Sequence, residues 1–109
     1  MGEALSSRID LSPDQLAIVR GILQRHVPQY EVWVFGSRAK PKAKPYSDLD
    51  LAIITTRPLS PDVRSALAED FSESDLPWKV DIVDWATTSE AFRHIIEQSR
   101  VILETPPKP

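Results

Sequence analysis

The apolar segment YEVWVFG, residues 30–36, constrains the fold of this chain more than any other feature. Its β-branched and aromatic residues predict a β-strand. Val32 and Val34 would face one side of the sheet, and Trp33 and Phe35 the other. Because both faces are apolar, the sheet that contains this strand must be covered on both sides. Gly36 ends the strand.

The remaining patterns alternate between helix and strand. Ser-Pro-Asp begins two predicted helices, with serine as the cap, proline at the first helical position and aspartate in the first turn. Apolar residues then recur at helical spacing. We expect helices at 11–27, 60–74 and 88–100, and further strands at 47–56, 78–85 and, as a short last strand, 101–104.

This order predicts an α/β (α+β) fold, a small mixed β-sheet with helices packed on it. The segment from Leu49 to Val83 should form a right-handed parallel crossover, while the short link between the first two strands favours an antiparallel pair. The 109 residues suit a single domain, 1–109, with a core of about 12–104. We expect a loose N-terminus and a disordered proline-rich tail.

Composition excludes several classes of function. The chain has 13 Lys and Arg against 16 Asp and Glu, a net charge of −3, which argues against direct nucleic-acid binding by bulk charge and leaves only a local basic patch open. The absence of cysteine excludes disulfides and thiolate chemistry. No apolar run is long enough to cross a membrane, and the N-terminus lacks the apolar stretch of a signal peptide. We therefore expect a cytoplasmic protein.

Three aspartates point to metal-assisted chemistry. Asp48 and Asp50 alternate with apolar residues along the second predicted strand, so they share one face. Two such carboxylates raise each other's pKa unless a cation compensates. Oxygen ligands favour Mg²⁺ or Mn²⁺ over zinc. Asp81, in the third predicted strand, completes a set that could hold two metal ions and clamp a triphosphate for in-line displacement. Asp84 is the rival acid, but alternation puts it on the opposite face, so we favour Asp81.

The Gly36-Ser37 turn suits a phosphate. Gly36 lets the backbone approach an anion closely, and a helical turn that begins at Ser37 would offer free N–H groups and a hydroxyl. Arg38 could contact phosphate or form a surface ion pair. Trp78 and Trp85 flank the third predicted strand, where packing is favoured over stacking on a nucleobase. His26 and His94 are not expected to be metal ligands.

Together, "FGSRA…YSDLDLAI…VDIVD" resembles the DNA polymerase β-like nucleotidyltransferase superfamily, and at this length its minimal nucleotidyltransferases, the MNT or MntA-like proteins. The resemblance implies a transferase that moves a nucleoside monophosphate, AMP from ATP, with pyrophosphate leaving and two Mg²⁺ ions bound, or Mn²⁺ in their place. It assigns catalysis and metal binding to the three aspartates. It assigns nucleotide binding to Gly36, Ser37, Arg38 and Ser47.

Minimal members are commonly encoded beside a small helical HEPN-type ribonuclease toxin, which they neutralise by binding it and by adding AMP to it. The resemblance therefore implies a HEPN-type toxin as partner and a protein hydroxyl as acceptor. Two alternatives are an antitoxin that acts by binding alone, and a nucleotidyltransferase for a small molecule such as an aminoglycoside. Members of the latter group carry an extra helical domain, for which this chain is too short. A homodimer or a toxin complex would complete the shallow catalytic face.

The sequence departs from the minimal pattern at two places. Lys40 and Pro41 stand where Arg and Gly often follow the Gly-Ser motif, and proline removes a backbone N–H that could bind phosphate. Such members also tend to end the last strand with a Leu-Tyr pair, and the C-terminal segment VILETPP has no tyrosine.

Overall fold

The computed structural model describes residues 11–36 and 48–105, and within them it contains the predicted helices and strands. One short 3₁₀ helix was not predicted. In chain order the elements are α2 (Pro13–His26), β1 (Glu31–Phe35), β2 (Leu49–Ile54), α3 (Pro61–Glu73), β3 (Val80–Asp84), η2 (Trp85–Thr87), α4 (Glu90–Ser99) and β4 (Val101–Glu104).

The strands form one mixed sheet in the order β3-β2-β1-β4. β1 pairs antiparallel with β2 and with β4, whereas β2 and β3 are parallel and connected through α3. The predicted antiparallel pair, parallel crossover and short last strand are therefore confirmed. A register irregularity lies between Val32 and Trp33, where β1 meets β4.

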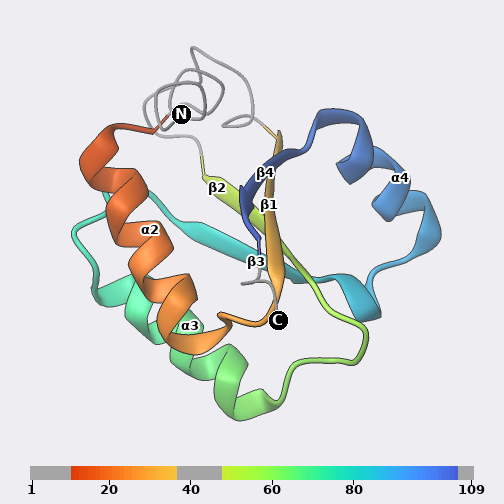
Figure 1. Ribbon diagram of the computed structural model, residues 1–109, viewed down its shortest axis with the longest axis horizontal. Coiled ribbons are helices and arrows are strands. Elements are labelled where there is room, and N and C mark those ends of the chain that lie inside the picture. The colour runs from red at the N-terminus through yellow and green to blue at the C-terminus, as the bar shows by residue number, and fades with distance from the viewer. Residues whose placement is uncertain (1–10, 37–47, 106–109) are drawn as a thin grey trace.

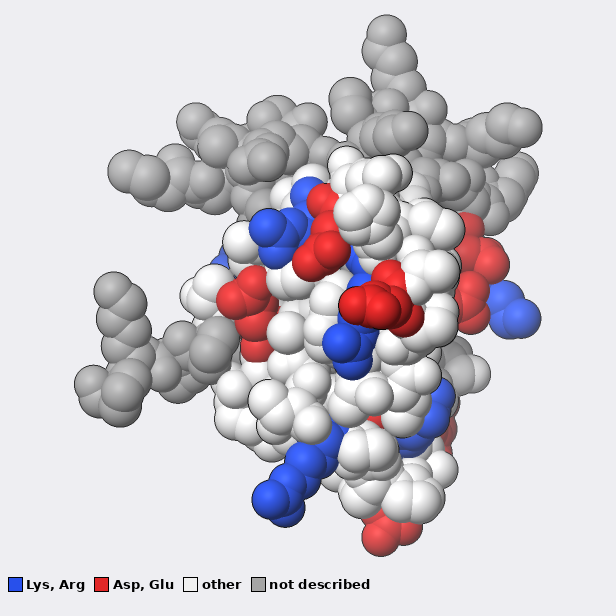
Figure 2. Space-filling model, turned by 90° about the vertical axis from the view of Figure 1, so that its right-hand side faces the viewer, with Lys and Arg blue, Asp and Glu red and all other residues white. Residues whose placement is uncertain are grey.

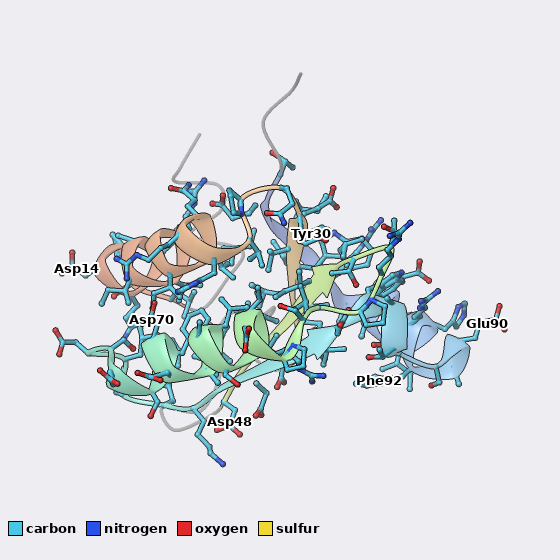
Figure 3. All side chains as sticks on the ribbon, turned by 90° about the horizontal axis from the view of Figure 1, so that it is seen from below. Asp14, Tyr30, Asp48, Asp70, Glu90 and Phe92 are labelled. Atoms are coloured by element: carbon cyan, nitrogen blue, oxygen red, sulfur yellow. The ribbon has the colours of Figure 1, made fainter. Side chains whose placement is uncertain are left out.

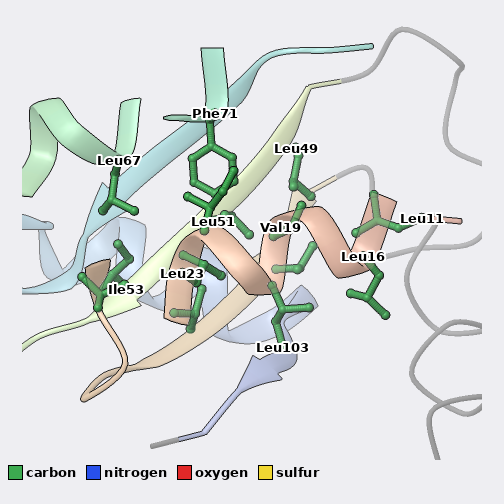
Figure 4. Close-up of a cluster of buried hydrophobic side chains, with 14 of the residues drawn as sticks. Leu11, Leu16, Val19, Leu23, Leu49, Leu51, Ile53, Leu67, Phe71 and Leu103 are labelled. Carbon is green, nitrogen blue, oxygen red and sulfur yellow. The ribbon is translucent and has the colours of Figure 1, made fainter. Parts of the chain in front are cut away.

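Helices cover the sheet unequally on its two sides (Figure 1). α2 and α3 lie together on one face, and α4 lies on the other. The larger core forms under α2 and α3, where Leu23, Leu51 and Leu67 are almost completely buried. Figure 4 shows how side chains from the two helices and the sheet interdigitate there. Burial of this kind stabilises the fold by roughly 1.5–3 kcal/mol for each large apolar side chain.

The opposite face carries a smaller core under α4. It consists of Trp33, Phe35, Ala52 and Ile96, all buried. The alternation predicted for the first strand is thus confirmed, because Val32 and Val34 belong to the larger core. Both apolar faces of β1 are covered.

Local capping explains where the helices begin. Ser12 and Ser60 accept hydrogen bonds from the backbone N–H groups of Gln15 and Val63, and a proline follows each serine, as predicted. Ser89 caps α4 in the same way. The second and third strands are shorter than predicted. Asp48 consequently stands just before β2 rather than within it.

Candidate active site

The candidate site begins where β1 ends and β2 starts, at the top of Figure 1. Phe35, the last residue of β1, pairs with Asp50 of β2, and Gly36 follows with a left-handed φ of 75°. A Cβ added at Gly36 would lie only 2.6 Å from Asp50 Oδ2. The carboxylate of Asp50 therefore rests against the Gly36 backbone, in space that any other residue would fill.

A second acid meets Asp50 from the neighbouring strand. Asp81 is its partner in the parallel β2–β3 pair, so the two side chains leave the same face of the sheet. The pKa of Asp50 is raised above its ordinary value of 3.8, first by partial burial and then by the negative charges of Asp81 and Asp48. Asp48 and Asp81 are exposed. Figure 3 labels Asp48 where the described chain resumes.

The donor set has the chemistry that a divalent metal needs. The carboxylate oxygens of Asp48, Asp50 and Asp81 are hard ligands. A bound cation would relieve the repulsion that Asp50 experiences from the other two carboxylates. In residues 11–36 and 48–105 no three acidic or histidine side chains converge as a ready metal-binding group. Asp50 and Asp81 form the paired part of the set, and Asp48 lies outside the strand. The residues therefore fit a divalent cation by donor type and charge.

Asp84 has a different role. It is 2% exposed and lies on the sheet face under α2 and α3, as alternation predicted. Its carboxylate accepts hydrogen bonds from the Thr55 hydroxyl, from Leu59 N at 2.7 Å and from Ala86 N at 3.3 Å. These bonds join the ends of β2 and β3 to the segments that follow them. Asp84 is therefore a buried hydrogen-bond acceptor on the opposite face of the sheet from Asp81. It cannot take the place of Asp81 beside Asp50.

The two tryptophans near the third strand are packed. Trp85 meets Trp33 edge to face with ring centroids 4.9 Å apart, and the guanidinium of Arg93 lies 4.9 Å from the Trp85 ring centroid. Arg93 also donates to the Trp85 carbonyl. Trp78 packs against the larger core. The preference for packing over base stacking at these two positions agrees with these contacts.

α4 also contributes to this end of the sheet, which the sequence patterns did not predict. The rings of Phe92 and Phe35 are in contact, with centroids 5.9 Å apart, and Ser99 Oγ accepts from Gly36 N at 3.5 Å. Phe92, Ile96 and Ser99 occur at i, i+4 and i+7, a spacing that puts them on one side of a helix. That spacing was the one feature of the sequence from which this shared side of α4 could have been predicted.

The other residues considered from the sequence fall into two groups. His26 lies at the end of α2 and bonds to Asp70 of α3, while His94 is exposed on α4. Neither belongs to the carboxylate cluster. A second group lies outside the described residues, so its placement stays a prediction. It comprises Ser37, Arg38, Lys40, Pro41 and Ser47.

Charge is distributed without a dominant sign on the α4 side of the molecule. Figure 2 shows Lys and Arg scattered among Asp and Glu there, over the described residues, rather than gathered into a broad basic patch. Within the same residues, no helix combines the length and apolar character that crossing a bilayer requires.

Comparison with known proteins defines the class. The family model "Polymerase beta, Nucleotidyltransferase" matches residues 19–108. The chain therefore belongs to the polymerase beta nucleotidyltransferase family, and the enzyme class and fold predicted from the motif are confirmed. A curated relative, the probable protein adenylyltransferase MntA of Haemophilus influenzae, is 58% identical over 98 residues, which cover 90% of this chain and 86% of the relative.

Solved structures share the fold. A crystal structure of a toxin-antitoxin with AMP-PNP matches with a TM-score of 0.70 at 23% identity, over 83% of this chain and 73% of that chain. A structure of the tri-AMPylated Shewanella oneidensis HEPN toxin in complex with MNT antitoxin matches with a TM-score of 0.63 at 23% identity, over 83% and 69%. At 23% identity these matches show a shared fold. They agree with the resemblance to minimal nucleotidyltransferases.

Proposed function

We propose that this protein transfers AMP from ATP to a hydroxyl group of a protein partner. The observation that carries the proposal is the position of Asp50, which lies against the Gly36 backbone on one side and beside Asp81 on the other. The two carboxylates supply the negative charge that binds a cation, and the family match supports a nucleotide triphosphate beside that cation. The 58% identity to a probable protein adenylyltransferase supports AMP and a protein as the transferred group and the acceptor.

The proposed reaction is an in-line displacement at the α-phosphorus of ATP. The acceptor oxygen forms a bond to that phosphorus, and the bond to the oxygen that bridges the α- and β-phosphates breaks. Pyrophosphate leaves with the electron pair of the broken bond. The proton of the acceptor hydroxyl passes to Asp81, the exposed acid of the pair, and from there to water. Gly36, with Ser37 beyond it, would hold the triphosphate.

We assign two Mg²⁺ ions to Asp48, Asp50 and Asp81. When bound, Mg²⁺ supplies positive charge that stabilises the transition state and favours the deprotonated acceptor. Asp50 would hold the metal together with Asp48 and Asp81, the two acids whose negative charges raise its pKa.

The partner that we propose is a HEPN-type helical toxin, and the protein would act as its antitoxin. Matching folds in toxin-antitoxin structures, one of them with a tri-AMPylated HEPN toxin, support this choice. An antitoxin that acts by binding alone, and an enzyme that modifies a small molecule, are the outcomes against which the proposal is tested.

The test uses ATP labelled at the α-phosphate, Mg²⁺ and a HEPN-type helical toxin as the candidate acceptor. We expect label on the partner with the wild type, and a loss of at least about 100-fold in rate for Asp50→Asn and Asp81→Asn. Asp75→Asn is the matched control, because Asp75 is an exposed acid on the α3–β3 connection. Full neutralisation of the toxin without any transfer would support binding alone, and label on a small molecule instead would contradict the protein acceptor.

A further inference from the structure

One aromatic side chain remains available on the carboxylate face. Among the aromatic residues that the structure describes, Phe92 of α4 is the most exposed, at 38%. Trp33 and Trp85 on the same side are engaged with each other and with arginines. Phe92 touches Phe35 edge to face and still keeps 38% of its surface exposed.

Phe92 lies close to the proposed catalytic residues. Its contact, Phe35, pairs with Asp50 and directly precedes Gly36. Across the sheet the order is therefore Asp81 on β3, Asp50 on β2 and Phe35 on β1, with Phe92 over Phe35. Figure 3 labels Phe92 on α4.

A second exposed apolar residue extends this surface. Ile95 is 58% exposed and lies one helical turn after Phe92. Ser99, a further turn along, accepts the hydrogen bond from Gly36 N. Phe92 and Ser99, which flank Ile95 along α4, thus both contact the Gly36 end of β1. We call Phe92 and Ile95 the apolar ledge.

We propose that the nucleobase of the bound nucleoside triphosphate packs on the apolar ledge, with its ring stacked on Phe92 and Ile95 beside it. This inference rests on the proposed function and names the part of the site that binds the nucleoside. A base is flat, largely apolar on its faces and adjacent to the phosphates, so an exposed aromatic ring next to an anion site is complementary to it. Because every base has a π-face, stacking of this kind discriminates weakly between bases.

The test separates the base from the phosphates. Binding of Mg-ATP and of Mg-tripolyphosphate is measured by calorimetry for the wild type, Phe92→Ala, Phe92→Leu and Phe92→Trp. We expect the wild type to bind Mg-ATP more tightly than Mg-tripolyphosphate. Phe92→Ala should weaken Mg-ATP roughly tenfold or more and leave Mg-tripolyphosphate unchanged. Phe92→Leu, which keeps an apolar contact to Phe35, should show the same selective loss, and Phe92→Trp should restore binding.

Ile102→Ala is the matched control, because Ile102 is 44% exposed on β4 and outside the ledge. Equal binding of Mg-ATP by the wild type and Phe92→Leu would overturn the inference while the proposed function stands. Equal losses for both ligands would overturn it too, since Phe92 would then act only through the fold. Normal Mg-ATP binding with reduced transfer to the protein would assign the ledge to the acceptor instead. A wild type that binds neither ligand would overturn the proposed function and this inference together.

Discussion

Two glycines should respond in opposite ways to the same substitution. Gly36→Ala should destabilise the protein and disable the proposed site, whereas Gly21→Ala should stabilise the protein. Gly36 has a φ of 75° and touches the Asp50 carboxylate. Gly21 is an exposed residue inside α2, with nothing within 4 Å of the position where a Cβ would stand. Comparing the two variants therefore distinguishes Gly36, where the backbone conformation requires glycine, from Gly21, where it does not.

The expected magnitudes follow from backbone conformation and space. An alanine in the left-handed region costs about 1–2 kcal/mol. At Gly36 the added Cβ would also lie 2.6 Å from Asp50 Oδ2, a clash that the carboxylate relieves only by rotating away from its position. At Gly21 alanine has better helix propensity by roughly 0.5–1 kcal/mol. The free energies of unfolding of the two variants should thus differ by about 1.5–3 kcal/mol, and by more if the clash with Asp50 is not relieved.

Urea denaturation followed by tryptophan fluorescence measures the stabilities, and Mg-ATP binding with AMP transfer measures the site. We expect Gly36→Ala to lose far more activity than its reduced stability explains at temperatures where it is folded. Gly21→Ala should keep full activity with a higher denaturation midpoint. A Gly36→Ala protein with wild-type stability and transfer rate would refute the reasoning, because the close approach to Asp50 would then have no consequence.

Three further predictions concern stability. Asp84→Ala should lower the free energy of unfolding by about 2–4 kcal/mol, since it leaves buried donors without an acceptor, and an unchanged urea midpoint would contradict this role. The pKa of Asp70 is lowered from 3.8, mainly by the hydrogen bond from His26. Asp70→Asn should therefore destabilise the protein to its full extent above pH 3.8, and the difference from the wild type should disappear as the pH falls below that value. Denaturation at several pH values would check this. Ser12→Ala removes the cap that Gln15 reciprocates and should lower the stability by about 1 kcal/mol, measurable as a lower melting temperature.

Strand alternation explains why much of the carboxylate arrangement could be predicted. The period of two places Asp50 on the opposite face from Leu49 and Leu51, and Asp81 on the opposite face from Val80. The apolar residues fix which face is buried, so the acids must occupy the other. A short parallel crossover favours β2 and β3 as neighbours. The register that sets Asp50 directly beside Asp81 is a further condition, which alternation alone does not determine.

Contacts between distant elements could not be predicted in this way. The pairing of Ser99 with Gly36 and of Phe92 with Phe35 depends on where α4 lies on the sheet, which no local pattern determines. The burial of Asp84 depends on the turn after β2, because Thr55 and Leu59 supply the donors. The local sequence does not show whether a polar side chain near a strand end is solvated or hydrogen-bonded to a buried backbone group.

The sheet order has a consequence for synthesis of the chain. β1 can pair with β2 early, but its other edge is filled by β4 (Figure 1), the last of the described strands to be made. Arg20 of α2 also pairs with Glu104 in that last strand. A chain that lacks β4 therefore exposes one edge of β1 to solvent. A chain truncated before Val101 would leave an open strand edge on β1 that another chain could occupy.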